Sequence, residues 1–126
     1  MTPPARLSRS TVNALHASQI IGLRAGLADH RFIAVWVVVV DDRVFVRPWN
    51  DKPAGWYRAF LEDPRGVLQL GEREIKIRTR RNRGERLMDA IDNAYKEKYR
   101  TPGAQKWVRG FATRRRRSTT LELLPR

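Results

Sequence analysis

The chain of 126 residues contains no cysteine and only two histidines, His16 and His30. Without a thiol, the protein cannot have a cysteine nucleophile, a thiolate metal site, an iron–sulfur cluster or a disulfide. Neither histidine stands at metal-ligand spacing from a cluster of carboxylates, so the sequence offers no candidate metal centre. A chain of this length should bury roughly two-thirds of its extended surface on folding, so a hydrophobic core is sufficient to stabilise it.

Long hydrophobic segments are missing as well. The longest apolar run, residues 32–40, has nine residues, whereas a membrane-spanning helix needs about 20. Residues 1–10 include two prolines and lack the apolar stretch of a secretory signal. We therefore expect a cytoplasmic protein, and the absence of cysteine agrees with a reducing compartment.

The common signatures of enzymes are also absent. The sequence has no serine motif of the hydrolase type, no phosphate-binding loop of the Walker type and no dinucleotide-binding glycine fingerprint. The neighbouring carboxylates Asp41 and Asp42 are typical of a turn, and Glu62 with Asp63 is typical of a helix end. The sequence therefore names no catalytic residue, and whether the protein is an enzyme stays open.

Positive charge, in contrast, is in large excess. The chain carries 26 Lys and Arg against 13 Asp and Glu, and its formal net charge is +13. Most of the excess lies in residues 64–126, and a field of this sign attracts nucleic acids, phosphates and acidic surfaces. However, 21 of the 26 cations are arginine, and a GC-rich genome produces that bias without any anionic partner. Composition alone leaves both explanations open.

The pattern of apolar residues and turn formers predicts one domain over residues 9–126, preceded by a flexible arm over residues 1–8. We expect strands at residues 20–24, 32–40, 43–47, 67–70, 74–79 and 119–124, and helices at residues 10–19, 56–62, 87–99 and 105–113. Short turns join several of these strands into hairpins. The inventory favours an α+β fold with a small barrel of about six mostly antiparallel strands and two to four helices that plug its openings.

Two cations occupy unusual positions in this pattern. Lys98 shares the apolar stripe of a predicted helix, where a buried ammonium is costly unless an anion or a hydrogen-bond acceptor compensates it. The alternative is a lysine at the margin of the stripe whose ammonium reaches water. Arg47 ends a predicted strand beside a loop with Trp49 and Trp56, and a guanidinium beside indoles suits phosphate binding and ring stacking. The alternative for Arg47 is a salt bridge to a loop carboxylate such as Asp51.

A second group of cations forms a row and a run in the C-terminal half. Alternation along the strand predicted at residues 74–79 places cations on one face, and four consecutive arginines follow later. Such a surface can bind nucleic acid through its phosphates, although a run of charges is usually a solvated face. The candidate nucleic-acid-binding residues are Lys76, Arg78, Arg80, Arg81, Arg83, Arg114, Arg115, Arg116 and Arg117.

Several strings occur in a characteristic order along the chain. They are Trp36-Val37-Val38, Phe45-Val46-Arg47, Trp56-Tyr57-Arg58-Ala59, Gly71, the A-Y-x-x-K-Y string at residues 94–99 and the T-L-x-L-x-P-R string at residues 120–126. From about residue 32 to residue 126 the chain thus resembles the bacterial family called domain of unknown function 2255. Pro48 departs from this family, which usually has a serine after the arginine.

A more distant resemblance concerns the loop that leads into Trp56 and Tyr57. It is similar to the segment with which split-barrel flavin- and deazaflavin-dependent reductases hold their cofactor. This resemblance implies a split β-barrel and a homodimer with the cofactor at the subunit interface, where cations bind its phosphate.

Two hypotheses on function follow. In the first, a phosphorylated flavin-like or deazaflavin cofactor, such as flavin mononucleotide (FMN), binds in a groove of a dimeric split barrel. The residues expected to bind this cofactor are Arg47, Trp49, Trp56, Tyr57 and Lys98, with the two cations on the phosphate and the aromatic side chains around the ring. If hydride transfer occurs, the cofactor supplies the chemistry and the protein is an oxidoreductase. In the second hypothesis, the basic C-terminal half is a nucleic-acid or polyanion binding module.

Overall fold

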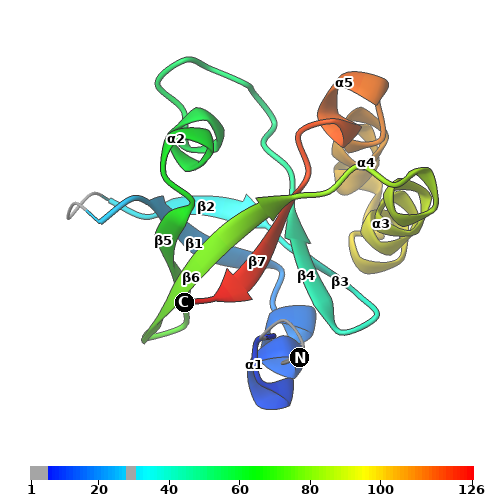
Figure 1. Cartoon of the computed structure of the whole chain (residues 1–126). Coiled ribbons are helices and arrows are strands. Elements are labelled where there is room, and N and C mark those ends of the chain that lie inside the picture. Colours follow the sequence, from blue (N-terminus) through cyan, green and yellow to red (C-terminus); the bar gives the residue numbers. More distant parts are fainter. Residues whose placement is uncertain (1–5, 28–30) are drawn as a thin grey trace.

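The computed structural model describes residues 6–27 and 31–126, and within these residues the chain forms a seven-stranded sheet. The strands are β1 (Ile20–Ala25), β2 (Ile33–Trp36), β3 (Val38–Val40), β4 (Arg43–Val46), β5 (Arg65–Leu70), β6 (Arg73–Arg81) and β7 (Leu121–Pro125). Their order is β2-β1-β5-β6-β7-β4-β3, and every neighbouring pair is antiparallel. The sheet curls into a nearly closed barrel (Figure 1).

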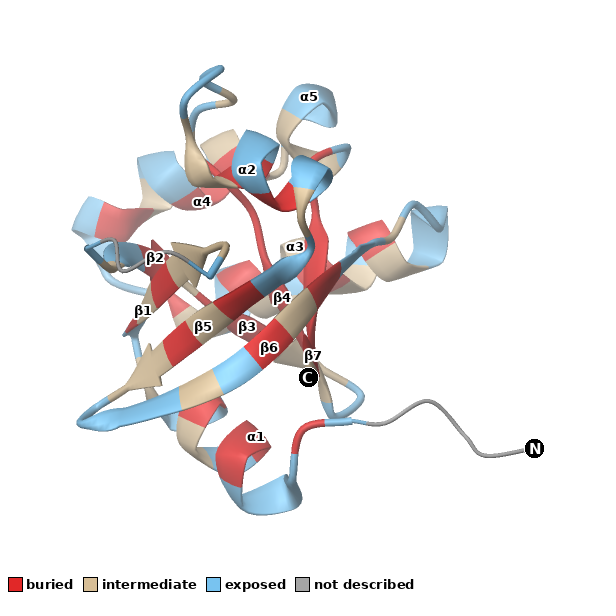
Figure 2. Cartoon of the chain, turned by 60° about the vertical axis from the view of Figure 1, so that its left-hand side comes forward, coloured by how far each residue is buried: buried red, intermediate tan, exposed pale blue. Residues whose placement is uncertain are grey.

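Five α-helices and one short 3-10 helix complete the part of the chain that the structure describes. They are α1 (Arg9–Ala17), α2 (Trp56–Glu62), α3 (Glu85–Lys98), η1 (Pro102–Ala104), α4 (Gln105–Phe111) and α5 (Arg114–Arg117). Two of them, α1 and α2, lie at opposite ends of the barrel (Figures 1 and 2), while α3, α4 and α5 gather beside it (Figure 1). Among these helices, none combines the length and apolar character that crossing a bilayer requires.

The expected α+β barrel is therefore confirmed, with two differences in the count. The sheet has seven strands because residues 32–40 form β2 and β3 instead of one strand. The helices number five because the four consecutive arginines form the single turn α5. Of the sequence features discussed above, His30 and residues 1–5 of the arm lie outside the described residues.

The break between β2 and β3 lies at Val37, whose backbone bonds to side chains. Its N–H donates to the Tyr99 hydroxyl at 3.0 Å, and its carbonyl accepts from Lys98 Nζ at 2.8 Å. The Tyr99 hydroxyl in turn donates to the Gln19 carbonyl at 2.5 Å. The end of α3 thus connects the broken strand to the segment that follows α1, and these bonds satisfy backbone groups that would otherwise be buried without partners.

The β3–β4 connection is the hairpin expected at residues 41 and 42. Val40 pairs with Arg43, so the turn has two residues. Asp41 and Asp42 both have positive φ, at 51° and 61°, and this is the backbone conformation of the type I′ turn that fits the twist of a hairpin. Asp tolerates this region better than most residues, so the turn forms without glycine.

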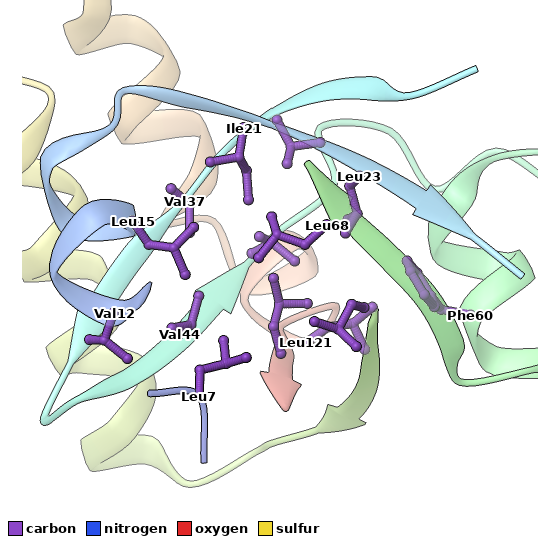
Figure 3. Packing of buried hydrophobic residues seen from close by; sticks show 14 of the residues in the cluster. Leu7, Val12, Leu15, Ile21, Leu23, Val37, Val44, Phe60, Leu68 and Leu121 are labelled. Atoms are coloured by element: carbon purple, nitrogen blue, oxygen red, sulfur yellow. The ribbon is translucent and has the colours of Figure 1, made fainter. Parts of the chain in front are cut away.

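Two hydrophobic clusters stabilise the fold on the two faces of the sheet. The inner cluster fills the barrel, where Leu15 of α1, Leu23 and Leu68 are fully buried together with Phe60 of α2 (Figure 3). The outer cluster packs α3 and α4 against the sheet, where it includes the fully buried Phe45 of β4. Because the outer face of β4 is covered, its residues lie in a low-dielectric environment, which decides the behaviour of the polar groups there.

Glu122, on the neighbouring strand β7, is a buried polar group with several hydrogen bonds. It is only 1% exposed and accepts hydrogen bonds from Arg43 at 2.9 and 3.0 Å, from Arg80 at 2.8 Å and from Asn82 at 3.0 Å. Burial alone would raise the pKa of Glu122, but these hydrogen bonds outweigh it and lower the pKa from 4.5 to about 2. The carboxylate thereby joins β4, β6 and β7 in the charged state.

Tyr95 of α3 and Tyr99, the residue that follows this helix, provide a matched test of the Val37 break. Both are buried. The Tyr95 hydroxyl has no hydrogen-bond partner within the described residues, whereas the Tyr99 hydroxyl bonds to the backbone of Val37 and of Gln19. We expect Tyr99→Phe to lower the free energy of unfolding by about 1–3 kcal/mol, because it leaves buried backbone groups unpaired. Tyr95→Phe should change it by less than about 0.5 kcal/mol, since no bond is lost. If urea denaturation gives the same decrease in the free energy of unfolding for both variants, this description of the strand break is wrong.

The Glu122 cluster predicts a specific acid sensitivity. A carboxylate with a lowered pKa in the folded state adds stability above its ordinary pKa of 4.5, and this stability is lost as the pH falls toward 2. Glu122→Gln should therefore cost roughly 2 kcal/mol at neutral pH and flatten the decline in stability between these pH values. The control Glu72→Gln, in an exposed turn, should leave that decline unchanged. A wild-type pH profile in the Glu122 variant would be inconsistent with the cluster.

Candidate functional site

All four tryptophans of the chain line one cavity, which has a volume of about 860 Å³. It opens between the β1–β2 hairpin, the segment that joins β4 to α2, the first residues of α2, and α4. The four residues are Trp36, Trp49, Trp56 and Trp107. Cavities of roughly 300–1,000 Å³ are typical of sites for small molecules and cofactors, so this concavity is the candidate site.

The chain fixes the two central indoles by stacking. Trp36, the last residue of β2, lies parallel to the Tyr99 ring with 3.9 Å between the ring centroids. Trp49 meets Trp107 edge to face at 4.6 Å. The Arg116 guanidinium lies 3.6 Å from the Trp49 ring centroid, and its Nε donates to the Trp49 carbonyl at 2.8 Å. The aromatic walls are therefore held in place before any ligand binds.

Gly110 of α4 is part of the same arrangement. A Cβ atom at this position would stand 2.3 Å from the six-membered ring of Trp49, which is far inside van der Waals contact. Only glycine lets α4 approach the Trp49 indole this closely.

The charges that face the cavity are all positive. Its lining includes Arg24, Arg31, Arg47 and Lys52, and among the described lining residues there is no carboxylate. Nor do these lining residues include histidine, serine, threonine, tyrosine or cysteine, and the one uncharged polar side chain is that of Asn50. The cavity thus offers flat apolar walls and cations, but no group suited to proton transfer near neutral pH.

Arg47 lines this cavity, yet its guanidinium is committed to the protein interior. The side chain is fully buried and donates to Asp92 at 2.6 Å, to Thr120 Oγ1 at 2.8 Å and to the Phe111 carbonyl at 2.9 Å. Of the two alternatives in the sequence, a salt bridge is the one formed, but the partner is Asp92 of α3. Asp51 instead forms a bidentate salt bridge with Arg58, with N–O distances of 2.7 and 2.8 Å.

The structure brings Arg47, Trp49 and Trp56 to the cavity, but it does not bring the other two expected residues there. The Lys98 ammonium donates to the carbonyls of Leu15 and Val37, at 3.0 and 2.8 Å, and it lines a different cavity, beside β3 and the end of α3. Burial lowers the pKa of Lys98 from 10.5 to about 8. Tyr57 is 4% exposed and belongs to the cluster inside the barrel.

The candidate nucleic-acid residues divide into two groups. Some are bonded within the protein: Arg80 to Glu122, Arg116 to Trp49, and Arg117 to Glu85, Asp89 and Asp92. Others lie at the surface, and these are Lys76, Arg81, Arg83, Arg114 and Arg115, while Arg78 is half-buried. Half of the four-arginine run therefore supports the fold.

Sequence reasoning missed two of the tryptophans of the cavity, Trp36 and Trp107, and three of its cations, Arg24, Arg31 and Lys52. One signal was present: Trp36 and Val35 alternate on β2, and Val35 faces the barrel interior, so Trp36 has to face outward. For Trp107 and the three cations, no local sequence pattern distinguishes a residue that lines a cavity from any other surface residue. Among the described residues, no group of His, Cys, Asp and Glu could hold a metal ion.

Comparisons with known proteins agree with the family resemblance. The model of a family described as an uncharacterized protein conserved in bacteria, domain of unknown function 2255, matches residues 10–123. A comparison with curated proteins gives no match.

Among solved structures, the fold is similar to the crystal structure of a conserved hypothetical protein from Mycobacterium tuberculosis, with a TM-score of 0.61 and 12% sequence identity. The match covers 98% of this chain and 82% of that chain. At this identity the likeness is one of fold. Since the family model spans nearly the whole sequence, the chain belongs to the bacterial family described as domain of unknown function 2255.

Proposed function

We propose that the tryptophan-lined cavity binds a flat aromatic ligand that carries negative charge, the class to which FMN and the phosphorylated deazaflavins belong. The observation that carries the proposal is the composition of the cavity wall: it holds every tryptophan of the chain, the exposed cations Arg31 and Lys52, and no carboxylate among its described lining residues. Indole walls favour a planar ring by stacking and by burial of its apolar surface. The cations compensate a phosphate, and the missing carboxylates avoid repulsion.

The phosphate would be bound at the open side of the cavity. Arg31 and Lys52 are exposed and line the cavity, so both can reach an anion there without losing an internal bond that stabilises the fold. Arg47 is excluded from this role by its bonds to Asp92 and Thr120. Its part is to hold the wall in place, as its bond to the Phe111 carbonyl illustrates.

The same lining limits the chemistry of the protein itself. Because no described lining residue is a suitable acid, base or nucleophile, any hydride transfer would be carried out by the bound cofactor, with the protein supplying orientation and exclusion of water. The protein would then be an oxidoreductase of the cofactor-dependent kind, and otherwise a cofactor-binding protein.

A homodimer is part of the proposal. Ile33 and Trp107 line the cavity and are 41% and 38% exposed, and exposed apolar side chains beside a binding site favour coverage by another chain. A second copy over this opening would exclude water from the ring. Light scattering of the FMN-saturated protein should give twice the mass of one chain, and the mass of a single chain would exclude the dimer.

The proposal predicts a difference between FMN and riboflavin, which share a ring but differ in the phosphate. All four tryptophans line the cavity, so quenching of their fluorescence reports binding directly. We expect FMN to bind about tenfold more tightly than riboflavin, since one charge-assisted contact is worth about 1.4 kcal/mol or more. Lys52→Glu should remove most of this difference and leave riboflavin binding nearly unchanged.

The matched control is Lys96→Glu, which makes the same change in net charge on α3 away from this cavity. It should preserve the preference for FMN. If both variants lose the preference for FMN equally, then the net charge of the protein sets this preference and Lys52 has no specific role in it. If neither flavin binds, and duplex DNA binds with an affinity that falls steeply with salt, the exposed basic residues are the functional surface instead.

A further inference from the structure

A second, smaller cavity of about 290 Å³ adjoins the tryptophan-lined one. Trp49, Asn50 and Lys52 line both cavities, so the segment that follows β4 forms the partition between them. On its far side, the small cavity is closed by Arg115 and Arg116 of α5. Trp49 and Lys52 are therefore available both to a ligand in the large cavity and to a group in the small one.

The small cavity is electrostatically suited to an anion. Three cations, Lys52, Arg115 and Arg116, line it. Its one carboxylate, Asp51, is already neutralised, because both of its oxygens accept hydrogen bonds from Arg58. The remaining charge of the lining is positive, and phosphoryl oxygens are the groups that arginine and lysine together bind best.

The position of one of these cations is set in advance. Arg116 is held by its bonds to the carbonyls of Trp49 and Gly110, at 2.8 and 3.1 Å, and by its stacking on the Trp49 ring. Lys52 lies within the partition itself. The hydroxyls of Thr113 and Thr119, which also line the cavity, donate to backbone carbonyls, so the cations are the donors that remain for a ligand.

We infer that the small cavity binds a second anionic group of the same ligand, so that the ligand is an aromatic ring with a diphosphate or a longer anionic substituent. The inference rests on the proposed function for the ring, but the anion subsite can be measured by itself. Lys52, at the partition, contacts the first phosphoryl group, and Arg115 contacts the group beyond it.

The test compares two neighbouring arginines of α5. Arg114 and Arg115 are both exposed, but only Arg115 lines the small cavity. Affinities for FMN and for flavin adenine dinucleotide, which carries a diphosphate, are measured by tryptophan fluorescence, and inorganic pyrophosphate is titrated by calorimetry. We expect the dinucleotide to bind about tenfold more tightly than FMN, since a charge-assisted contact is worth about one order of magnitude. Arg115→Glu should abolish this difference and also abolish pyrophosphate binding, while Arg114→Glu should retain both.

The outcomes separate the two proposals. Pyrophosphate binding that depends on Arg115, without binding of any flavin, supports the anion subsite and ends the proposed function for the ring. FMN binding with no preference for the dinucleotide, and no pyrophosphate binding, overturns the inference and leaves the proposed function intact. Equal effects of Arg114→Glu and Arg115→Glu on the dinucleotide and on pyrophosphate also overturn it, because a specific subsite requires them to differ.

Discussion

The buried guanidinium of Arg47 is the interaction on which the rest of the site depends. It stands at the end of β4 and bonds to Asp92 on α3, to Phe111 on α4 and to Thr120 just before β7. A buried charge is stable only when its partners are complete, and the loss of one partner costs several kcal/mol. These three bonds therefore fix the outer helices relative to the barrel. Trp49 follows Arg47 by two residues, so the position of the central indole depends on the same anchor.

The surroundings of Trp49 extend this anchor to the candidate site. Trp49 is packed against Phe111 and Trp107 and covered by Arg116. Arg117, the next residue, bonds to Asp92, which is also the partner of Arg47. Part of the large basic excess is thus used to build the cavity wall, while other cations, such as Lys52, stay exposed. Burial and ion pairing decide which arginines are structural.

Local patterns were sufficient to predict much of the fold. The helices at residues 56–62 and 87–99, the hairpin at Asp41 and Asp42, and the closing strand before the C-terminus all follow from apolar periodicity and turn residues, and they agree with α2, α3, the β3–β4 turn and β7. The break at Val37 could not be predicted, because its cause is the Tyr99 side chain, 62 positions away. The salt-bridge partner of Arg47 could not be predicted for the same reason, as Asp92 is 45 positions away. Alternation places a side chain on a face of a sheet, but the groups that cover that face come from elsewhere in the chain.

The central claim is that one cavity brings the four tryptophans around a flat anionic ligand. Fluorine NMR of protein labelled with 5-fluorotryptophan tests it most directly, since the chain has four tryptophans and all four line the cavity. On titration with FMN, the account predicts that all four resonances shift together with a single dissociation constant. Resonances that stay unchanged at saturating FMN, or a shift of the exposed Trp107 alone, would contradict it.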